Sequence, residues 1–368
     1  MGVSREQITQ MQSEGVRWIE PDSLGLNRRG GAGPTDHKAL NFSQQTSMIP
    51  VFNEQVSHSR YSAKLNADDT QVLIFENDTL LDVADVPIQP NFYKLKTQDG
   101  IPYSHIATLH SKDVLATTVL QTCVRYRNRE TSCQFCAIEE SLKNGKAITH
   151  KMPGQLAEVA KSAVELDGVK QMIMTTGTPK TLDRGAAVLV ESARAVKAAV
   201  DIPIQAQCEP PDDDIWFERL KDAGVDALGM HLEAVSDRVR EAIMPGKATV
   251  PLSRYFSAYK AAVNVFGPGN VSTYILAGLG DSEEEIIVMS EKLIELGVYP
   301  FVVPFVPVAG TPLENHPMPD SQMLDRIFSK IGPALMKRGI ASEKLAAGCA
   351  KCGACSSLKS YERSLDNV

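Results

Sequence analysis

From residue 114 onward, short apolar runs alternate with longer stretches in which apolar residues recur every three or four positions. Short apolar runs are typical of buried strands, and the longer periodic stretches are typical of amphipathic helices. The predicted strands are 115–120, 171–175, 202–207, 227–232, 271–276 and 300–306, and the predicted helices between them are 153–165, 184–198, 215–223, 251–265 and 283–296. Strands that alternate with helices in this way run parallel and are joined by right-handed crossovers.

This alternation predicts an α/β fold built on a partial (β/α)6 TIM-like barrel. A nucleotide-binding sheet is disfavoured because no GxGxxG motif follows the first strand. Three parts are expected: a small β-rich N-terminal extension at 1–112, the barrel core at 113–320, and a C-terminal segment at 321–368 that begins with a helix at 321–337. The extension contains β-rich runs at 71–75 and 91–95, and a Gly-rich loop at 28–34 that is either a turn or an anion site.

Composition narrows the class of protein. With 368 residues, 40.1 kDa and 43% hydrophobic residues, the chain can bury a full core. A net charge of -7 gives no reason to expect nucleic acid, and no apolar run approaches the length needed to span a membrane. The polar N-terminus at 1–18 lacks the apolar core of a signal peptide, so a cytoplasmic protein is expected. Its expected partners are a small-molecule substrate and a redox protein.

Six of the seven cysteines form two tight groups: Cys123, Cys133 and Cys136, and then Cys349, Cys352 and Cys355. Each group offers three thiolates, one fewer than a closed four-coordinate site needs, so each can hold an iron-sulfur cube with one open iron. Disulfides would need an oxidising compartment. A zinc site would favour two CxxC pairs about 15 to 20 residues apart, but these pairs are more than two hundred residues apart. A thioredoxin-like redox pair would explain only Cys133 and Cys136.

The first cysteine group follows the first predicted strand, which brings it to the mouth of the barrel, where such folds collect their active sites. Arg125, Arg127 and Arg129 in the same loop are either available to offset the charge of a thiolate-bound cluster or are a solvated face. The seventh cysteine, Cys208, is either a small buried residue or lies near a cluster.

Over residues 113–318 the chain resembles the radical S-adenosylmethionine (radical SAM) superfamily. In that family three cysteines after the first strand hold a [4Fe-4S] cluster, the last two form a CxxC pair, and the residue before the third cysteine is usually aromatic, as Phe135 is here. The departure is the first gap, which has nine residues where the family usually has three. A few branches share the longer gap, so the resemblance still implies Cys123, Cys133 and Cys136 as ligands.

Later segments are similar to the biotin synthase and lipoyl synthase branch. The segment 229–235 resembles the fourth-strand motif, which implies that His231 and Glu233 face the ribose of the cofactor. The segment 275–283 resembles the fifth-strand motif that brackets the adenine, which implies contacts from Gly278, Leu279 and Gly280. The same residues can also be a strand-to-helix turn closed by a capping box between Ser282 and Glu285. The segment 304–314 resembles the sixth-strand motif of biotin synthase-like proteins.

Two further segments give weaker matches. Thr176 and Gly177 occupy the place of the family's Gly-Gly-Glu motif, which binds the methionyl amino group, but the acid is missing. Gln205, Gln207 and Glu209 follow the third predicted strand and are candidates for contact with cofactor or substrate. No residue is assigned a catalytic role.

The resemblance implies an enzyme that reductively cleaves S-adenosylmethionine (SAM) at a [4Fe-4S] cluster to a 5′-deoxyadenosyl radical, which abstracts hydrogen from a small molecule. A flavodoxin- or ferredoxin-type reductant is expected. Cys349, Cys352 and Cys355 look like the site of an auxiliary [4Fe-4S] cluster, whose fourth ligand is Cys208, another side chain or substrate. The exact reaction, of oxidoreductase or transferase type, is open.

The whole chain also resembles an uncharacterised radical SAM family encoded beside nitrilases, which suggests a link to nitrile or cyanide metabolism. Two alternatives remain. One is a non-catalytic iron-sulfur scaffold or electron-transfer protein, and the other is a zinc-stabilised barrel enzyme.

Overall fold

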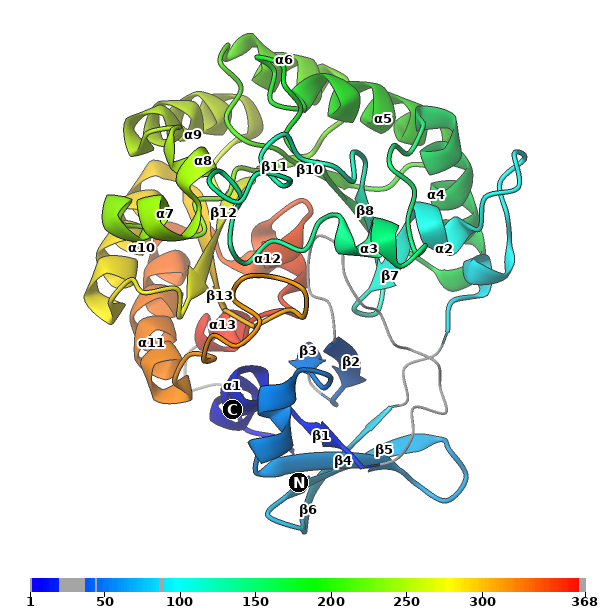
Figure 1. Cartoon of the computed structure of the whole chain (residues 1–368), viewed down its shortest axis with the longest axis vertical. Coiled ribbons are helices and arrows are strands. Elements are labelled where there is room, and N and C mark those ends of the chain that lie inside the picture. The colour runs from blue at the N-terminus through cyan, green and yellow to red at the C-terminus, as the bar shows by residue number, and fades with distance from the viewer. Residues whose placement is uncertain (1, 20–36, 44, 86–88, 364–368) are drawn as a thin grey trace.

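The computed structural model describes residues 2–19, 37–43, 45–85 and 89–363 (Figure 1). Its larger sheet has seven strands in the order β13-β12-β11-β10-β9-β8-β7. Six of them are parallel, and their bounds are β8 (Val114–Thr118), β9 (Gln171–Thr175), β10 (Ile204–Gln207), β11 (Ala227–Gly229), β12 (Val271–Ala277) and β13 (Val298–Pro304). The predicted partial barrel of six parallel strands is confirmed. A strand that was not predicted, β7 (Thr108–His110), pairs antiparallel with β8.

Helices cover the outside of the curved sheet (Figure 1). They are α4 (Pro153–Asp167), α5 (Ala186–Ala199), α6 (Ile215–Asp222), α9 (Leu252–Phe266), α10 (Glu283–Leu296) and α11 (Ser321–Arg338), close to the predicted bounds. The helix α10 begins with the expected capping box: Ser282 Oγ accepts from the Glu285 amide, and Glu285 accepts from the Ser282 amide. Such caps stabilise a helix by about 1 kcal/mol. Short helices α7 (Asp237–Ile243) and α8 (Pro245–Ala248) follow β11 and were not predicted.

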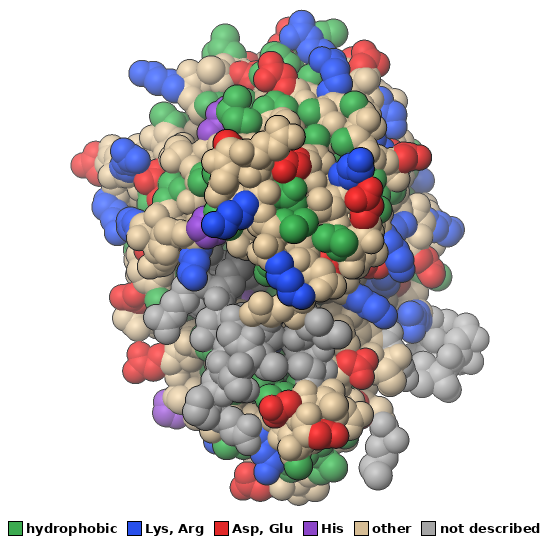
Figure 2. Space-filling model, turned by 90° about the vertical axis from the view of Figure 1, so that its right-hand side faces the viewer, with side chains coloured by type: hydrophobic (Ala, Val, Ile, Leu, Met, Phe, Trp, Pro, Cys, Tyr) green, Lys and Arg blue, Asp and Glu red, His purple; other side chains and the backbone are tan. Residues whose placement is uncertain are grey.

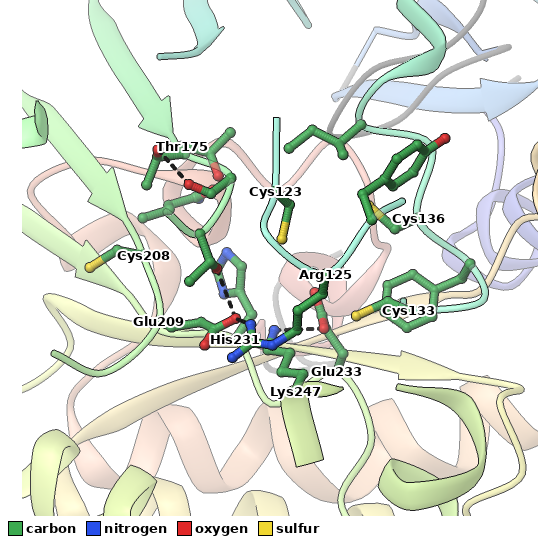
Figure 3. Close-up of a pocket in the computed structure, with 17 residues that line it drawn as sticks. Cys123, Arg125, Cys133, Cys136, Thr175, Cys208, Glu209, His231, Glu233 and Lys247 are labelled. Carbon is green, nitrogen blue, oxygen red and sulfur yellow. Dashed lines mark hydrogen bonds and ion pairs between the residues drawn. The ribbon is translucent and has the colours of Figure 1, made fainter. Parts of the chain in front are cut away.

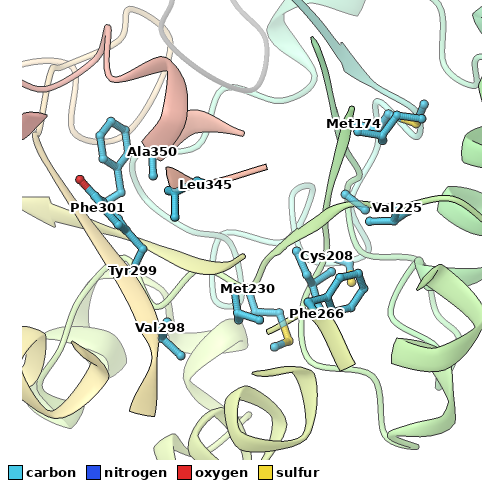
Figure 4. Packing of buried hydrophobic residues seen from close by; sticks show 14 of the residues in the cluster. Met174, Cys208, Val225, Met230, Phe266, Val298, Tyr299, Phe301, Leu345 and Ala350 are labelled. Carbon is cyan, nitrogen blue, oxygen red and sulfur yellow. The ribbon is translucent and has the colours of Figure 1, made fainter. Parts of the chain in front are cut away.

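The main hydrophobic core fills the layer between sheet and helices. In Figure 4, Met174, Val225, Met230 and Phe266 lie in this layer, and Cys208 lies among them. These side chains are at most a few per cent exposed, and full burial of each large apolar side chain stabilises the fold by roughly 1.5–3 kcal/mol. The apolar positions that gave the helical period in the sequence are the ones that face the sheet.

A second, smaller sheet belongs to the N-terminal part of the chain and has the order β1-β4-β5-β6-β2-β3. Its strands are β1 (Arg17–Trp18), β2 (His37–Asn41), β3 (Thr46–Pro50), β4 (Tyr61–Leu65), β5 (Gln71–Glu76) and β6 (Thr79–Asp85). The strand predicted at 71–75 is therefore present. The helix α1 (Arg5–Glu14) packs against β3 and α11 and was not predicted. The Gly-rich loop at 28–34 lies outside the described residues.

The strand predicted at 91–95 is wrong, because Asn91–Lys94 forms a 3₁₀ turn, η2. The Asp167 carboxylate at the end of α4 accepts from the amides of Asn91 and Phe92 at 2.7 and 2.9 Å, and this contact holds the turn. Phe92 is fully buried in the barrel core, together with Tyr103 and Ile106 of α2 (Tyr103–Ile106). These three residues precede the expected boundary at 112 but pack with the barrel. That boundary stays a prediction.

The C-terminal segment enters the interior of the barrel. After α11 come η3 (Ser342–Lys344), α12 (Cys349–Cys352) and α13 (Leu358–Tyr361), and Figure 1 shows α12 within the arc of strands. The Gly348 amide donates to Gln171 Oε1 at 2.7 Å and the Cys349 amide to Gln205 Oε1 at 3.1 Å. Both glutamines are buried side chains of barrel strands. Figure 4 shows Leu345 and Ala350 beside Tyr299 and Phe301 of β13.

The N-terminal extension packs onto this C-terminal segment. The Met48 amide of β3 donates to the Ala354 carbonyl at 2.7 Å, and Thr9 of α1 shares a 2.7 Å hydrogen bond with Ser357. The three parts of the chain are therefore joined around the barrel interior. In Figure 2, acidic and basic side chains are interspersed over the described surface of the face shown. No helix within the described ranges is long and apolar enough to span a bilayer.

Candidate active site

A pocket opens at the C-terminal ends of the barrel strands, and the three cysteines of the first group line it (Figure 3). Their loop follows β8 and is held by backbone hydrogen bonds to the short helices α7 and α8. The Gln134 amide donates to the Ile243 carbonyl at 2.8 Å, and the Gly246 amide donates to the Thr131 carbonyl at 3.1 Å. The nine-residue gap thus forms a folded loop that brings Cys123 to the same pocket as Cys133 and Cys136.

Burial determines the chemistry of these thiols. It raises the pKa of Cys136 to about 12 and the pKa of Cys133 well above its ordinary value, and neighbouring Glu233 and the other thiols add to the effect. A bound cation would replace the protons, because thiolates are the form that ligates metal. In the described ranges no three His, Cys, Asp or Glu side chains are close enough to hold a single metal ion. A four-iron cube takes one thiolate per iron, so its ligands lie further apart than those of a single ion, and the donor set fits such a cube.

A carboxylate network lies beside the thiols. Glu209, from the loop after β10, accepts from Arg125 of the cysteine loop and, at 2.8 Å, from Thr178 Oγ of the loop after β9. Burial alone would lower the pKa of Arg125, but the Glu209 carboxylate raises it above its ordinary value. Glu209 Oε2 is buried and has no hydrogen-bond partner within the part of the chain that the structure describes. A buried carboxylate oxygen without a partner is costly, which indicates that a donor from a ligand belongs here.

Gly177 allows the loop after β9 to approach the cysteine loop. A Cβ at this position would lie 2.0 Å from the Thr122 carbonyl oxygen, so only glycine fits. The Gly177 amide donates to the Leu120 carbonyl at 2.9 Å, and the Thr176 hydroxyl donates to the Gly177 carbonyl at 2.9 Å. Both residues line the pocket, as expected of residues that contact the cofactor.

His231 and Glu233 line the same pocket, but β11 ends at Gly229 and they lie beyond it. The predicted strand 227–232 was too long. Glu233 instead has a backbone φ of 67° and is held by hydrogen bonds to β12. Its Oε2 accepts from Lys247 Nζ at 2.7 Å.

His231 is a neutral donor. Its Nδ1 accepts from the Tyr274 amide at 3.2 Å, which leaves the proton on Nε2. Burial, together with the nearby Lys247, lowers the pKa of His231 to about 3. Nε2 is buried and has no partner in the described part of the structure. It is a second polar atom beside the pocket that lacks a partner.

The fifth-strand residues lie elsewhere. Gly278, Leu279 and Gly280 form the turn between β12 and α10, and none of them lines the pocket. Leu279 is buried in a small cluster with Phe305, and the partly buried Cys133 and Phe135 pack against that cluster. The turn and capping-box interpretation therefore accounts for this segment, and its contact with adenine stays a prediction.

A second cavity, of about 310 Å³, continues from the first pocket into the barrel. Cys136, Gln207, His231 and Glu233 line both. At the inner end the cavity reaches Cys349 and Cys355, whereas Cys352 lines a separate pocket with Ser111 and Lys359. This second cavity, which is named the inner chamber below, therefore extends from Cys136 of the first cysteine group to Cys349 and Cys355 of the second.

The C-terminal thiols have polar neighbours. Gln207 Nε2 donates to Cys349 Sγ at 3.2 Å, and Cys355 Sγ lies 3.4 Å from His110 Nε2. Burial raises the pKa of Cys349 to about 11 and the pKa of Cys355 well above its ordinary value. Gln205 Oε1 accepts a hydrogen bond from the Cys349 amide, and Gln205 lines neither pocket.

Several residues of the site were not predicted from the sequence. Lys247, Tyr274 and His110 carry no motif, and each meets its partner only through the fold. Lys247 had one local signal, since it follows a Pro-Gly pair in the loop after β11. Cys208 was left between two interpretations. It lines the same pocket as the three thiols, but it is 7% exposed within the main core, and in Figure 3 its sulfur points away from them. This arrangement favours the buried structural role over that of a ligand.

Comparisons with known proteins give consistent matches. The sequence profile of the family described as the Radical SAM superfamily matches residues 126–293, a range that begins after Cys123. A bacteriochlorophyllide c C-7(1)-hydroxylase from Chlorobaculum limnaeum is 27% identical over 91% of this chain and 86% of its own length. A lipoyl synthase from Marinobacter nauticus is 26% identical over 45% of this chain and 47% of its own.

Two solved structures are also similar. Methylornithine synthase has a TM-score of 0.47 at 15% identity, covering 67% of this chain and 72% of that one. A radical SAM methyltransferase from Sphaerobacter thermophilus has a TM-score of 0.47 at 16% identity, covering 79% and 76%.

Proposed function

The chain belongs to the radical SAM superfamily, and from this premise we propose that it cleaves SAM reductively at a [4Fe-4S] cluster held by Cys123, Cys133 and Cys136. When bound, the cluster and SAM supply a 5′-deoxyadenosyl radical that abstracts hydrogen from a small molecule. The observation that carries the proposal is the pocket itself. Three thiols meet there with buried polar atoms of Glu209 and His231 that have no partner within the described residues.

The chain's own residues bind and orient the cofactor in this proposal. Glu209 Oε2 would accept from the methionyl amino group, so the acid that is missing after β9 is supplied from the loop after β10. Arg125 and Thr178 hold that carboxylate in place. Glu233 accepts from the ribose hydroxyls, and His231 Nε2 donates to the ribose. Gly177 keeps the loop after β9 packed against the cysteine loop that holds the cluster.

The ammonium group of Lys247 compensates the negative charge of Glu233. Its Nζ lies 2.7 Å from Glu233 Oε2, and the two side chains are 9% and 18% exposed. An ion pair of this kind holds the carboxylate in one orientation, which is what a ribose contact requires. The strained backbone at Glu233, at a φ of 67°, is consistent with a position set by function.

We further propose an auxiliary [4Fe-4S] cluster at Cys349, Cys352 and Cys355. Two of these thiols face the inner chamber, and donors such as Gln207 adjust the potential of such clusters through hydrogen bonds to sulfur. His110, 3.4 Å from Cys355, joins substrate as a candidate for the fourth ligand. Because Cys208 is buried in the core, it is disfavoured as the fourth ligand.

The remaining parts of the proposal rest on the sequence. They are a flavodoxin- or ferredoxin-type reductant, a cytoplasmic location, and the link to nitrile or cyanide metabolism. The Chlorobaculum limnaeum relative is named as a hydroxylase of bacteriochlorophyllide c. We propose for this chain the hydrogen abstraction, with the substrate placed in the inner chamber between the two cysteine groups.

Anaerobic reconstitution tests the proposal against a zinc-stabilised barrel and a non-catalytic iron-sulfur protein. The full chain should bind about eight irons if both sites hold four-iron cubes, and it should release 5′-deoxyadenosine from SAM under dithionite. Cys133→Ala should lose about half of the iron and all cleavage. Cys352→Ala should lose the other half while cleavage continues. Stoichiometric zinc without cleavage would support the zinc alternative, and iron without cleavage would support the scaffold.

A further inference from the structure

The N-terminal extension supplies part of the wall of the inner chamber. Gln12 of α1, His37 of β2 and Met48 of β3 line it together with residues of the barrel strands. The barrel sheet is open, with β13 and β7 at its edges, so the barrel does not enclose its own interior. The extension is fixed at this position by the hydrogen bond from Met48 to Ala354 in the C-terminal segment.

In the part of the wall that the extension supplies, one side-chain atom of Gln12 lacks a hydrogen-bond partner among the described residues. It is 2% exposed, and its Nε2 donates to the Ala354 carbonyl at 3.0 Å. A carbonyl accepts only from the NH₂ end of an amide, so this contact fixes which end is which. Gln12 Oε1 is buried, and the described residues offer it no partner. An unpartnered buried carbonyl costs about 1–3 kcal/mol, so a donor is expected to occupy the adjoining space.

The charges of the chamber indicate the kind of molecule that fits. Among the described residues its lining includes no lysine or arginine, and the Glu233 carboxylate is already paired with Lys247. The described side chains of the lining therefore offer a buried carboxylate or phosphate no permanently charged counter-ion, which is strongly unfavourable. Most of the remaining lining is apolar or aromatic, with Phe135, Tyr274 and Phe305 among it. A volume of about 310 Å³ suits a small molecule.

We propose that the extension closes the inner chamber and that Gln12 selects an uncharged substrate with an N–H or O–H donor and an apolar body. The inference rests on the proposed radical SAM function, because that function is what makes the occupant a substrate. It disfavours free amino acids, which carry a carboxylate, and simple nitriles, whose nitrogen only accepts hydrogen bonds. An alcohol, an amide or a neutral N–H heterocycle has the required donor.

Three probes of matched shape test this recognition in the reconstituted full chain with SAM present. Indole has an N–H donor, benzofuran replaces it with an acceptor oxygen, and indole-2-carboxylate adds a negative charge. Calorimetric titration should show indole binding about fivefold more tightly than benzofuran, the effect of one net hydrogen bond. The carboxylate should bind at least about tenfold more weakly than indole, since its charge has no partner.

Substitutions then assign the preference to one residue. In Gln12→Leu the two neutral probes should bind equally, because the acceptor is gone and the volume is nearly kept. Gln10→Leu is the matched control on the same helix, since Gln10 contacts Tyr61 and does not line the chamber, and it should keep the fivefold preference. Thermal melts of both variants report whether either one has lost its fold.

The outcomes separate this inference from the proposed function. Equal binding of indole and benzofuran to the wild type, tight binding of the carboxylate, or no binding of indole would overturn the inference. So would a preference that survives in folded Gln12→Leu. The wild-type comparison stands even if that variant does not fold. Production of 5′-deoxyadenosine from SAM without any probe is measured on the same wild-type sample, and its absence would refute the proposed function alone.

Discussion

Replacement of Glu209 by glutamine is the sharpest test of the proposed cofactor site. Glutamine keeps the size of the side chain and can still accept from Thr178, but it removes the negative charge. A hydrogen bond to a charged group contributes about 1.5–3 kcal/mol, and each 1.4 kcal/mol is a factor of about ten in affinity. The dissociation constant for SAM should therefore rise by about ten- to a hundredfold in Glu209→Gln.

The same substitution should also destabilise the protein. The side chains of Arg125 and Glu209 are 10% and 8% exposed, so the guanidinium would lose its buried counter-charge. Removing one partner of a buried pair costs about 3–5 kcal/mol. We take this as an upper limit, because the remaining glutamine oxygen still accepts a hydrogen bond. Urea titration of the unloaded protein measures this loss separately from SAM binding.

A second arginine–glutamate pair provides the control. Glu139 lies 3.1 Å from Arg127, their side chains are 9% and 80% exposed, and neither residue lines the pocket. Because the pair does not border the pocket, Glu139→Gln should leave SAM affinity within about twofold of the wild type. The assay is calorimetric titration of SAM into anaerobically reconstituted protein. SAM affinity in Glu209→Gln within about threefold of the wild type, or an equal loss in both variants, would refute the role given to Glu209.

Three more predictions concern single positions. Cys208→Val should keep the full iron content and SAM cleavage, since this thiol packs in the core, and a loss of iron on analysis would make it a ligand. Gly348→Ala should lose about half of the iron and keep SAM cleavage, because Gly348 has a φ of 109° and a Cβ would lie 2.3 Å from the Gln205 side chain. The pKa of His231 is about 3 in the folded protein, so as the pH falls below about 6.5 this side chain is protonated in the unfolded chain but not in the folded one. Acid therefore lowers the free energy of unfolding. His231→Asn should reduce that loss by up to about 2 kcal/mol between pH 7 and 5, and urea titrations with unchanged pH dependence would contradict it.

The barrel strands and helices could be predicted because their signals are local. A buried strand and an amphipathic helix each leave a period in neighbouring residues, and Gln171–Thr175 and Glu283–Leu296 were placed at their observed bounds. The predictions fail where contacts between residues distant in the sequence determine the local structure. The Asp167 carboxylate holds Asn91–Lys94 in a 3₁₀ helix. Beyond Gly229, where β11 ends, the Leu232 amide donates to Thr273 Oγ1 and the Tyr274 amide donates to His231 Nδ1, so side chains take the place of backbone partners.

The family, the order of the elements and the two groups of three cysteines could be predicted from the sequence, because each depends on residues close together in the chain. Only the tertiary structure showed that Cys136 of the first group and Cys349 and Cys355 of the second line one chamber, with Cys352 in a separate pocket. It alone brought Glu209 to Thr178, and Gln12 to the chamber wall. Such contacts join residues that are tens to hundreds of positions apart. They form only when parallel strands curve around a common interior and the two ends of the chain pack against it, and no local spacing records that arrangement.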